Sequence, residues 1–407
     1  MHNITKKKII GLDARALEPD FRAHFGRGTG RYAAKMIEEL EKIDHPKIIF
    51  RSIDSKKIRP EGWEKKLLKF APVGKMTLET QLIFPLKLLR AKEDYFHFFF
   101  HGDAPSFSLK PFFISALDLI PLKFKELYST GKEDLRFHFA RFLENRSIKS
   151  AKGVFAISQT TKEDLIEILN IDPNKIVVTP LGVDSRFFVD LDLDPDGVKR
   201  VSPFQVSEKI INNPALLKLI DSKFVYVGGI DERKNISFLI KAFSQLILNR
   251  EDQGLSTPKL VIIGRILNDK NYPKLKKLIS DYNLDTHVEI KGYLSDSEMI
   301  TELATARAFI FPSLYEGFGL PVIEAMASGV PVIAGDNSSV AEIINNKQGI
   351  LVADNDQAKW VESMEQILDS DELYLDLKER GRKRAGDFLW SKTAELTVAG
   401  YEKFLEL

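Results

Sequence analysis

A short segment near residue 320 combines two carboxylates, two glycines and the start of a helix. Glu316 and Glu324 stand eight positions apart, with Gly317 and Gly319 between them just before Pro321. Proline suits a first helical position, because its missing N–H would have no partner there in any helix. The glycines leave the backbone uncovered, so a ligand can touch amide groups at the positive end of that helix. The pattern predicts an anion site between two carboxylates that accept hydrogen bonds, which suits a ligand with both phosphate and sugar.

A second loop carries two adjacent cations. Arg233 and Lys234 lie between a predicted strand, which ends at Gly228 and Gly229, and the next helix. A departing diphosphate gains negative charge, so fixed cations here would stabilise the transition state more than the ground state. Taken alone, the two residues are explained equally well as an ordinary exposed charge pair.

A third glycine-rich turn, Gly26 to Tyr32, lies between the first predicted strand and its helix. Its amides could approach a phosphate or a sugar hydroxyl closely. By itself this turn is a weak signal, because such turns are often only tight corners.

Glu324 also has a structural interpretation. We place it in the first helical turn after Pro321, where the helix dipole and capping favour any glutamate. Its coincidence with Glu316 and the two glycines favours ligand binding instead.

Size and composition restrict the class of protein. A chain of 407 residues fits two domains, and a net charge of +1 argues against nucleic acid as a partner. The absence of cysteine excludes disulfides and thiolate metal sites, and the histidines show no metal-ligand spacing. No apolar run approaches the roughly 18–20 residues of a membrane span, and the N-terminus lacks a signal-peptide core. We therefore expect a soluble, cytoplasmic protein.

Short β-branched or aromatic runs alternate with longer amphipathic stretches in both halves of the chain. Buried apolar runs separated by helices favour parallel sheets, and two successive series favour two doubly wound α/β domains. Strands are expected at 8–13, 47–52, 96–100, 112–116, 153–158, 175–180, 224–228, 260–264, 288–292, 308–312, 332–334 and 350–352. Helices are expected at 29–43, 160–169, 235–248 and 296–306, with a last one from Trp390.

Two segments stand out by charge. Residues 190–197 alternate aspartate and leucine before a proline and a glycine, and we interpret them as an acidic surface connection rather than a DxD metal motif. Residues 56–92 interleave basic and apolar side chains. Such a stretch suits a peripheral contact with an anionic membrane, although a helix packed by its apolar side explains it as well.

The motif at Glu316 resembles the Glu-x7-Glu signature of the retaining GT-B glycosyltransferases of family 4, and the similarity extends over most of the chain. The loop Gly228–Asn235 resembles the family's phosphate loop. Further similar segments are Gly28–Tyr32, Phe100–Gly102, Ala156–Asp164, Pro180–Asp184 and the helix from Trp390.

The resemblance implies an α/β GT-B fold of two Rossmann-like domains facing across a cleft. Residues 1–185 would bind the acceptor and residues 186–389 the nucleotide-sugar. Residues 390–407 would form a helix that crosses back onto the first domain. It also implies no cofactor and no catalytic metal.

The resemblance further implies roles for single residues. Glu324 would bind ribose hydroxyls, Glu316 hydroxyls of the transferred sugar, and Arg233 with Lys234 the diphosphate. Other donor-binding positions are Phe318, Gly319, Leu320, Gly228, Gly229, Gly292, Tyr293 and Leu294, the last three holding the base largely through backbone groups. Acceptor-side positions are Gly28, Thr29, Gly30 and Arg31.

One position departs from the family pattern. Relatives have His-Asp-Leu-Ile-Pro where this chain has Leu117 followed by Asp118, and a leucine can neither transfer a proton nor form a hydrogen bond. In the family, that histidine lies over the donor sugar and commonly reaches its 6-hydroxyl. Three hypotheses follow: the donor lacks a 6-hydroxyl, as a 6-deoxyhexose or pentose does, His101 or Asp118 has taken over the role of the histidine, or transfer activity has been lost. The first two together are favoured, since the phosphate loop and both glutamates are intact.

We expect a metal-independent, retaining transferase of hexosyl type that moves sugar from a nucleotide-sugar to a hydroxyl. The expected acceptor is a bacterial cell-envelope polysaccharide or lipopolysaccharide, or its lipid-linked precursor, at the inner face of the membrane. This acceptor rests on analogy with the family. A nucleotide-sugar 2-epimerase on the same fold and a non-catalytic nucleotide-sugar-binding protein remain the alternatives.

Overall fold

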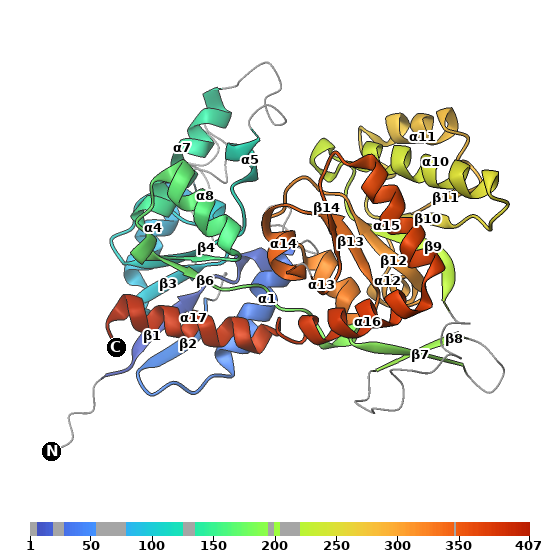
Figure 1. Ribbon diagram of the computed structural model, residues 1–407. Helices are drawn as coiled ribbons and strands as arrows, with labels where there is room; N and C mark the ends of the chain where they lie inside the picture. Colours follow the sequence, from blue (N-terminus) through green and yellow to red (C-terminus); the bar gives the residue numbers. More distant parts are fainter. Residues whose placement is uncertain are drawn as a thin grey trace. The chain divides into compact units, whose positions relative to one another are not determined.

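The computed structural model describes residues 6–18, 28–53, 79–124, 135–193, 199–203, 220–345 and 347–407. Contacts divide the chain into two compact units (Figure 1). The first contains Met1–Gly182 and Trp390–Leu407, and the second contains Val183–Leu389. The first division therefore falls three residues before the predicted domain boundary.

The first unit is built on a six-stranded parallel sheet in the order β2-β1-β3-β4-β5-β6. Its strands are β1 (Lys8–Leu12), β2 (Ile48–Ser52), β3 (Tyr95–Phe98), β4 (Phe112–Ala116), β5 (Gly153–Ala156) and β6 (Ile176–Val178). Its helices are α1 (Gly28–Glu41), α4 (Phe84–Arg90), α5 (Ile120–Lys123), α7 (Leu135–Ser150), α8 (Gln159–Leu169) and α17 (Trp390–Leu405).

Alternate residues of these strands serve the two faces of the sheet. On one face, Phe98 and Ile114 join a core that includes Phe84 of α4, Ile148 of α7 and Leu165 of α8. This two-residue alternation is the side-chain period of a strand.

The other face of the first sheet carries a buried polar network. His97 of β3 bonds through Nδ1 to the Tyr401 hydroxyl of α17, and its Nε2 lies 2.9 Å from Oγ of Ser115. The Tyr32 hydroxyl of α1 completes the network at 2.7 Å from Ser115 Oγ. The rings of Phe113 and Tyr401 pack edge to face at 5.0 Å. Helix α17 is thus held within the first unit.

The second unit is built on a six-stranded parallel sheet in the order β11-β10-β9-β12-β13-β14. Its strands are β9 (Asp221–Val227), β10 (Lys259–Ile263), β11 (Val288–Gly292), β12 (Ala306–Phe311), β13 (Val332–Gly335) and β14 (Ile350–Val352). Its helices are α10 (Ile236–Asp252), α11 (Tyr272–Asp281), α12 (Asp296–Ala304), α13 (Leu320–Ala327), α14 (Ser338–Ile344), α15 (Gln357–Asp369) and α16 (Asp371–Ala385). Helices α10, α11 and α15 pack together, as do α13, α14 and α16 (Figure 1). Every strand expected in the two sheets is present, with ends that differ by a few residues.

The expected acidic connection at 190–197 is wrong in one respect. Residues Val189–Leu193 form strand β7, which pairs antiparallel with β8 (Lys199–Pro203). The alternation of aspartate and leucine has the two-residue period of a strand, and the proline and glycine lie beyond its end. Residues 190–193 thus belong to one strand of a two-stranded sheet, and residues 194–198 lie outside the described part.

The basic segment 56–92 is described only from residue 79. There a π-helical turn (Glu79–Ile83) leads into α4, where Phe84 and Leu88 are buried while Leu86 and Leu89 are exposed.

Candidate functional site

The two loops with the predicted catalytic residues of the second unit follow neighbouring strands. Strands β9 and β12 pair at the centre of the sheet, with β10 on the other side of β9. Strand order reverses here, and open α/β sheets bind ligands outside the carboxyl ends of strands at such a switch point. The loop after β9 carries Arg233 and Lys234, and the loop after β12 carries Glu316.

These loops bring the three predicted residues into contact. Oε1 of Glu316 lies 2.5 Å from Nζ of Lys234, and Oε2 lies 3.0 Å from Nη1 of Arg233. The Ser313 hydroxyl donates to Oε1 at 2.6 Å. The side chains of Arg233, Lys234 and Glu316 are only 10%, 13% and 12% exposed, which excludes the interpretation of an ordinary exposed charge pair.

Charge balance keeps the carboxylate ionised. Burial opposes the charged form, but the charges of Lys234 and Arg233 outweigh it and hold the pKa of Glu316 below its ordinary value. The pKa of the buried Tyr226 changes in the opposite direction, because burial and the charge of Glu316 both raise it. That hydroxyl donates to the Gly229 carbonyl at 2.6 Å.

Backbone contacts fix the two loops to each other. Nη1 of Arg233 donates to the Tyr315 carbonyl at 2.6 Å, and the Leu314 amide donates to the Arg233 carbonyl at 2.9 Å. The cations and the carboxylate are therefore held in one rigid arrangement.

Helix α13 begins as predicted, after a glycine in a conformation that side chains disfavour. Gly319 precedes the helix with φ of 113°, and Pro321 occupies its first turn. Glu324 is the fifth residue of the helix, and the first turn contains no acidic residue. The first-turn position assigned to Glu324 is wrong, and the capping interpretation fails with it, since a capping box needs the third helical residue. The side chain is buried, with the residue only 5% exposed.

The backbone at Gly264 lies very close to Gly228, the first residue of the predicted phosphate loop. A Cβ at Gly264, after β10, would lie 2.0 Å from the carbonyl oxygen of Gly228. Only glycine at 264 therefore lets the ends of β9 and β10 meet. Further along the edge, Gly292 ends β11 with φ of 68°, and the exposed Tyr293 ring lies 4.6 Å from the Arg265 guanidinium. Leu294 follows in the same loop.

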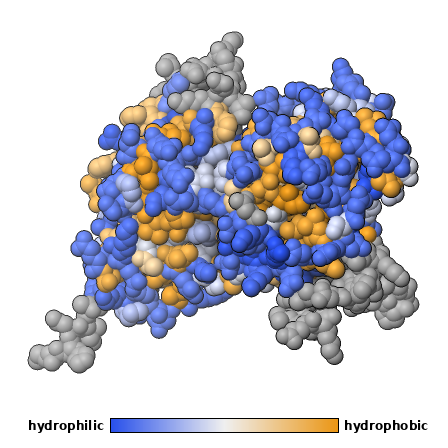
Figure 2. Space-filling view, viewed as in Figure 1, coloured by the Kyte–Doolittle hydropathy of each residue, from blue (hydrophilic) through white to orange (hydrophobic). Residues whose placement is uncertain are grey.

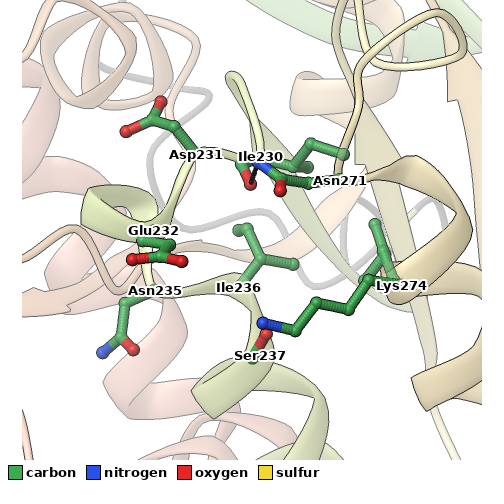
Figure 3. A pocket seen from close by; sticks show the side chains of 9 residues that line it. Ile230, Asp231, Glu232, Asn235, Ile236, Ser237, Asn271 and Lys274 are labelled. Atoms are coloured by element: carbon green, nitrogen blue, oxygen red, sulfur yellow. Dashed lines mark hydrogen bonds between the residues drawn. The ribbon is translucent and has the colours of Figure 1, made fainter. Parts of the chain in front are cut away.

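A pocket of about 220 Å³ is lined in part by the predicted phosphate loop, Gly228–Asn235, although none of its lining residues was among the predicted site residues (Figure 3). Its walls come from the loop after β9, the start of α10 and the start of α11. The Lys274 ammonium extends toward Ser237 (Figure 3). The lining residues are Ile230, Asp231, Glu232, Asn235, Ile236, Ser237, Asn271, Lys274 and Leu275.

Sequence reasoning also missed the start of α14. Ser338 and Ser339 contact the backbone around Glu316, and Asn337 contacts Ser313. The signal was available, because Asn337–Ser339 follow β13 and the carboxyl ends of neighbouring parallel strands share one edge.

Phe318 and Leu320 flank Gly319 at the start of α13, and the other predicted residues lie in the first unit. Gly28, Thr29, Gly30 and Arg31 form the first turn of α1, so this part of the glycine turn is already helical. His101 lies buried in a 3₁₀ turn (His101–Asp103) after β3. Asp118 accepts the Ile120 amide at 3.1 Å at the start of α5, and Leu117 beside it is half-buried.

Among the residues that the structure describes, no group of three or more histidines and carboxylates is arranged to hold a metal ion.

Comparisons with known proteins match both units. A family model described as glycosyl transferases group 1 matches residues 209–384, and one described as glycosyltransferase family 4 matches residues 26–187. The chain is 27% identical over 290 residues to the serotype-specific mannosyltransferase WbdA of Escherichia coli. That match covers 71% of this chain and 33% of the relative, so the chain spans about a third of that protein's length.

Two further likenesses cover nearly the whole chain. The O-antigen chain mannosyltransferase B of Escherichia coli is 25% identical over 394 residues, which is 92% of this chain and 96% of that protein. The structure of HepE from Anabaena in complex with UDP and glucose superimposes with a TM-score of 0.64 at 16% identity, covering 98% and 100% of the two chains. At that identity the likeness establishes the fold.

Proposed function

Because the chain belongs to the group 1, family 4 glycosyltransferases and has their GT-B fold, we propose that it transfers a glycosyl unit from a nucleotide-sugar to a hydroxyl group of a glycan. The observation that carries this proposal is the contact of Glu316 with Arg233 and Lys234 at the switch point of the second sheet.

The two cations have the positive charge that a diphosphate requires. The Lys234 ammonium has three N–H donors, and its hydrogen bond to Glu316 uses one of them. In the proposed complex both cations stabilise the charge that develops on the leaving diphosphate. Glu316 keeps them in place and accepts hydrogen bonds from hydroxyls of the sugar.

The mechanism we propose is metal-independent and retaining. The acceptor hydroxyl would attack the anomeric carbon of the donor sugar from the same face that the diphosphate leaves. Its proton would pass to the departing phosphate oxygen. Arg233 and Lys234 would supply the positive charge that the leaving group requires. Proton NMR of the product gives the anomeric configuration, and an inverted product would contradict this mechanism.

The similar proteins suggest the class of acceptor, and together with Leu117 they restrict the choice of donor sugar. Two relatives are named for mannose, one of them as an O-antigen chain enzyme, so we propose a cell-envelope glycan as the acceptor.

For the donor, Leu117 predicts a sugar without a 6-hydroxyl, whereas the relatives point to mannose, which has one. A panel of uridine, guanosine, adenosine and thymidine diphosphate sugars, in 6-hydroxy and 6-deoxy pairs, decides between them. Efficient use of the 6-hydroxy sugar alone would exclude the prediction from Leu117.

Incubation with the donor alone tests the alternatives. An epimerase converts the donor to a new nucleotide-sugar, and a pure binding protein leaves it unchanged even when acceptor is added. Our proposal requires product only when donor and acceptor are both present.

We further propose that the enzyme works at the inner face of a membrane, through a surface of the first unit. Among the described residues, no helix has the length and apolarity needed to span a bilayer. Figure 2 shows apolar side chains among the hydrophilic ones on the surface of the molecule. In the first unit, exposed apolar side chains lie on three segments: Leu86 and Leu89 on α4, Phe107 and Leu109 between β3 and β4, and Phe139 and Phe142 on α7.

Hydrogen bonds join these segments into one surface. The Ser150 hydroxyl of α7 donates to the Ser106 carbonyl at 3.1 Å, and Nζ of Lys110 donates to the Ala91 carbonyl beyond α4 at 2.6 Å. Arg146 and Lys149 continue the exposed stripe of Phe139 and Phe142 at helical spacing. Apolar and basic side chains mixed in this way suit an anionic lipid surface. Sedimentation with phosphatidylglycerol vesicles should exceed that with phosphatidylcholine, and a Phe139→Ser/Phe142→Ser variant should lose the difference.

A further inference from the structure

Ser338, the first residue of α14, has a backbone conformation that serine rarely adopts. Its φ is 47°, in the left-handed region where a side chain is crowded by its own backbone and glycine is ordinarily preferred. Non-glycine residues persist in such conformations where the surrounding structure imposes them, often at functional sites.

The hydrogen bonds of the Ser338 hydroxyl explain why serine, rather than glycine, stands at this position. It accepts the backbone N–H of Glu316 at 3.1 Å and donates to Oδ1 of Asn337 at 2.9 Å. Glycine would suit the backbone but would leave the Glu316 amide without this partner.

The contact closes a ring of hydrogen bonds around the carboxylate. Nδ2 of Asn337 donates to the Ser313 carbonyl at 2.9 Å, and the Ser313 hydroxyl donates to Oε1 of Glu316 at 2.6 Å. The ring begins at the amide of Glu316 and returns to its side chain. The fully buried Ser339 adds a second clamp, since its hydroxyl lies 2.8 Å from the Glu316 carbonyl and 2.6 Å from the Phe318 carbonyl.

We infer that Ser338 is a positioning residue for glycosyl transfer, whose hydroxyl orients Glu316 from a strained backbone. The inference rests on the proposed function. Because Glu316 would contact the transferred sugar, a small misplacement should weaken transition-state contacts more than donor binding.

Two variants separate the hydroxyl from the strain. Ser338→Gly removes the hydroxyl and relieves the backbone, so it should fold with an unchanged or higher Tm. Ser338→Ala removes the hydroxyl but keeps the crowded Cβ, so its Tm should not rise. Both should lower kcat by about tenfold while donor KM stays within about twofold. Asn345→Gly is the matched control: Asn345 has φ of 49° at the other end of α14 and is exposed, so this variant should keep wild-type kcat.

Each outcome bears on a different part of the proposal. Wild-type kcat in Ser338→Gly overturns the positioning role, even if Ser338→Ala fails to fold. A loss in Asn345→Gly equal to that in Ser338→Gly also overturns it, because the effect would then belong to the stability of α14. A wild-type protein that transfers no sugar from any donor overturns the proposed function instead. The positioning role falls with it, because it is a role in transfer.

Discussion

The carboxylate of Glu316 lies 2.5 Å from the ammonium of Lys234, although 82 positions separate the two residues in the chain. Arg233 reaches the other carboxylate oxygen at 3.0 Å. One acidic side chain therefore holds both cations that the sequence assigns to the diphosphate, and each member of this group should affect both stability and transfer.

Glu316→Gln should reduce kcat by about 10²–10³-fold, because it removes the charge of a group that contacts the reacting sugar in the proposed complex. It should also lower the Tm, since two poorly exposed cations lose their counter-charge. Initial rates and thermal unfolding measure the two effects. Glu379→Gln, on the exposed side of α16, is the control. Full activity in Glu316→Gln would contradict the assigned role.

Lys234→Met should raise the pKa of Glu316. Burial already favours the neutral carboxyl, and Lys234 is the first of the charges that oppose it. A carboxylate with a lowered folded-state pKa contributes stability above its unfolded value of about 4.5, and that contribution is lost as pH falls below it. In Lys234→Met this contribution should shrink, and the acidic limb of the kcat/KM profile should move to higher pH.

Rates measured between pH 4 and 8 test this shift, with Lys359→Met as the control, because Lys359 and its partner Glu362 are both half-exposed. An unmoved acidic limb would show that Glu316 does not control it.

His97 should make the stability of the protein depend on pH. Burial lowers the pKa of His97 to about 3. Between this value and about 6.5 the unfolded chain binds a proton that the folded chain does not, so stability falls as pH falls through that window. The contribution is roughly 1 kcal/mol per pH unit.

Urea unfolding at pH 5 and pH 7 should show a smaller pH effect in His97→Gln than in wild type. An equal effect in wild type and His97→Gln would mean that His97 does not titrate as proposed.

Gly264→Ala should destabilise the second unit by roughly 1–3 kcal/mol, because the new methyl group would overlap the Gly228 carbonyl. Gly229→Ala is the comparison, since its nearest neighbour would be Asp231 Oδ2 at 3.5 Å, an ordinary contact. Chemical denaturation should separate the two variants. If ligand phosphate approaches the amide of Gly229, donor KM should rise in Gly229→Ala without loss of stability.

Much of the fold could be predicted because its signals are local. Each buried strand is a short apolar run, each connecting helix has its own period, and parallel sheets need long crossovers. Strand β7 was missed because its aspartates, and the proline and glycine that follow it in the sequence, suggested a loop. The position of Glu324 was missed because a helix start is uncertain by one or two residues, and α13 begins at Leu320, one residue before the predicted Pro321.

By itself the sequence determined which residues of the site stand on which loops. Glycine and proline set the backbone conformation where they occur, so the loops and the charged residues on them could be recognised locally. Only the tertiary structure decided that Glu316 binds both Lys234 and Arg233, and that Ser338 and Asn337 join them. Those contacts depend on strand order, which puts the ends of β9, β12 and β13 at one edge of the sheet. Which strands pair, when they lie far apart in the chain, depends on the packing of the whole sheet. A local sequence pattern therefore does not predict the strand order.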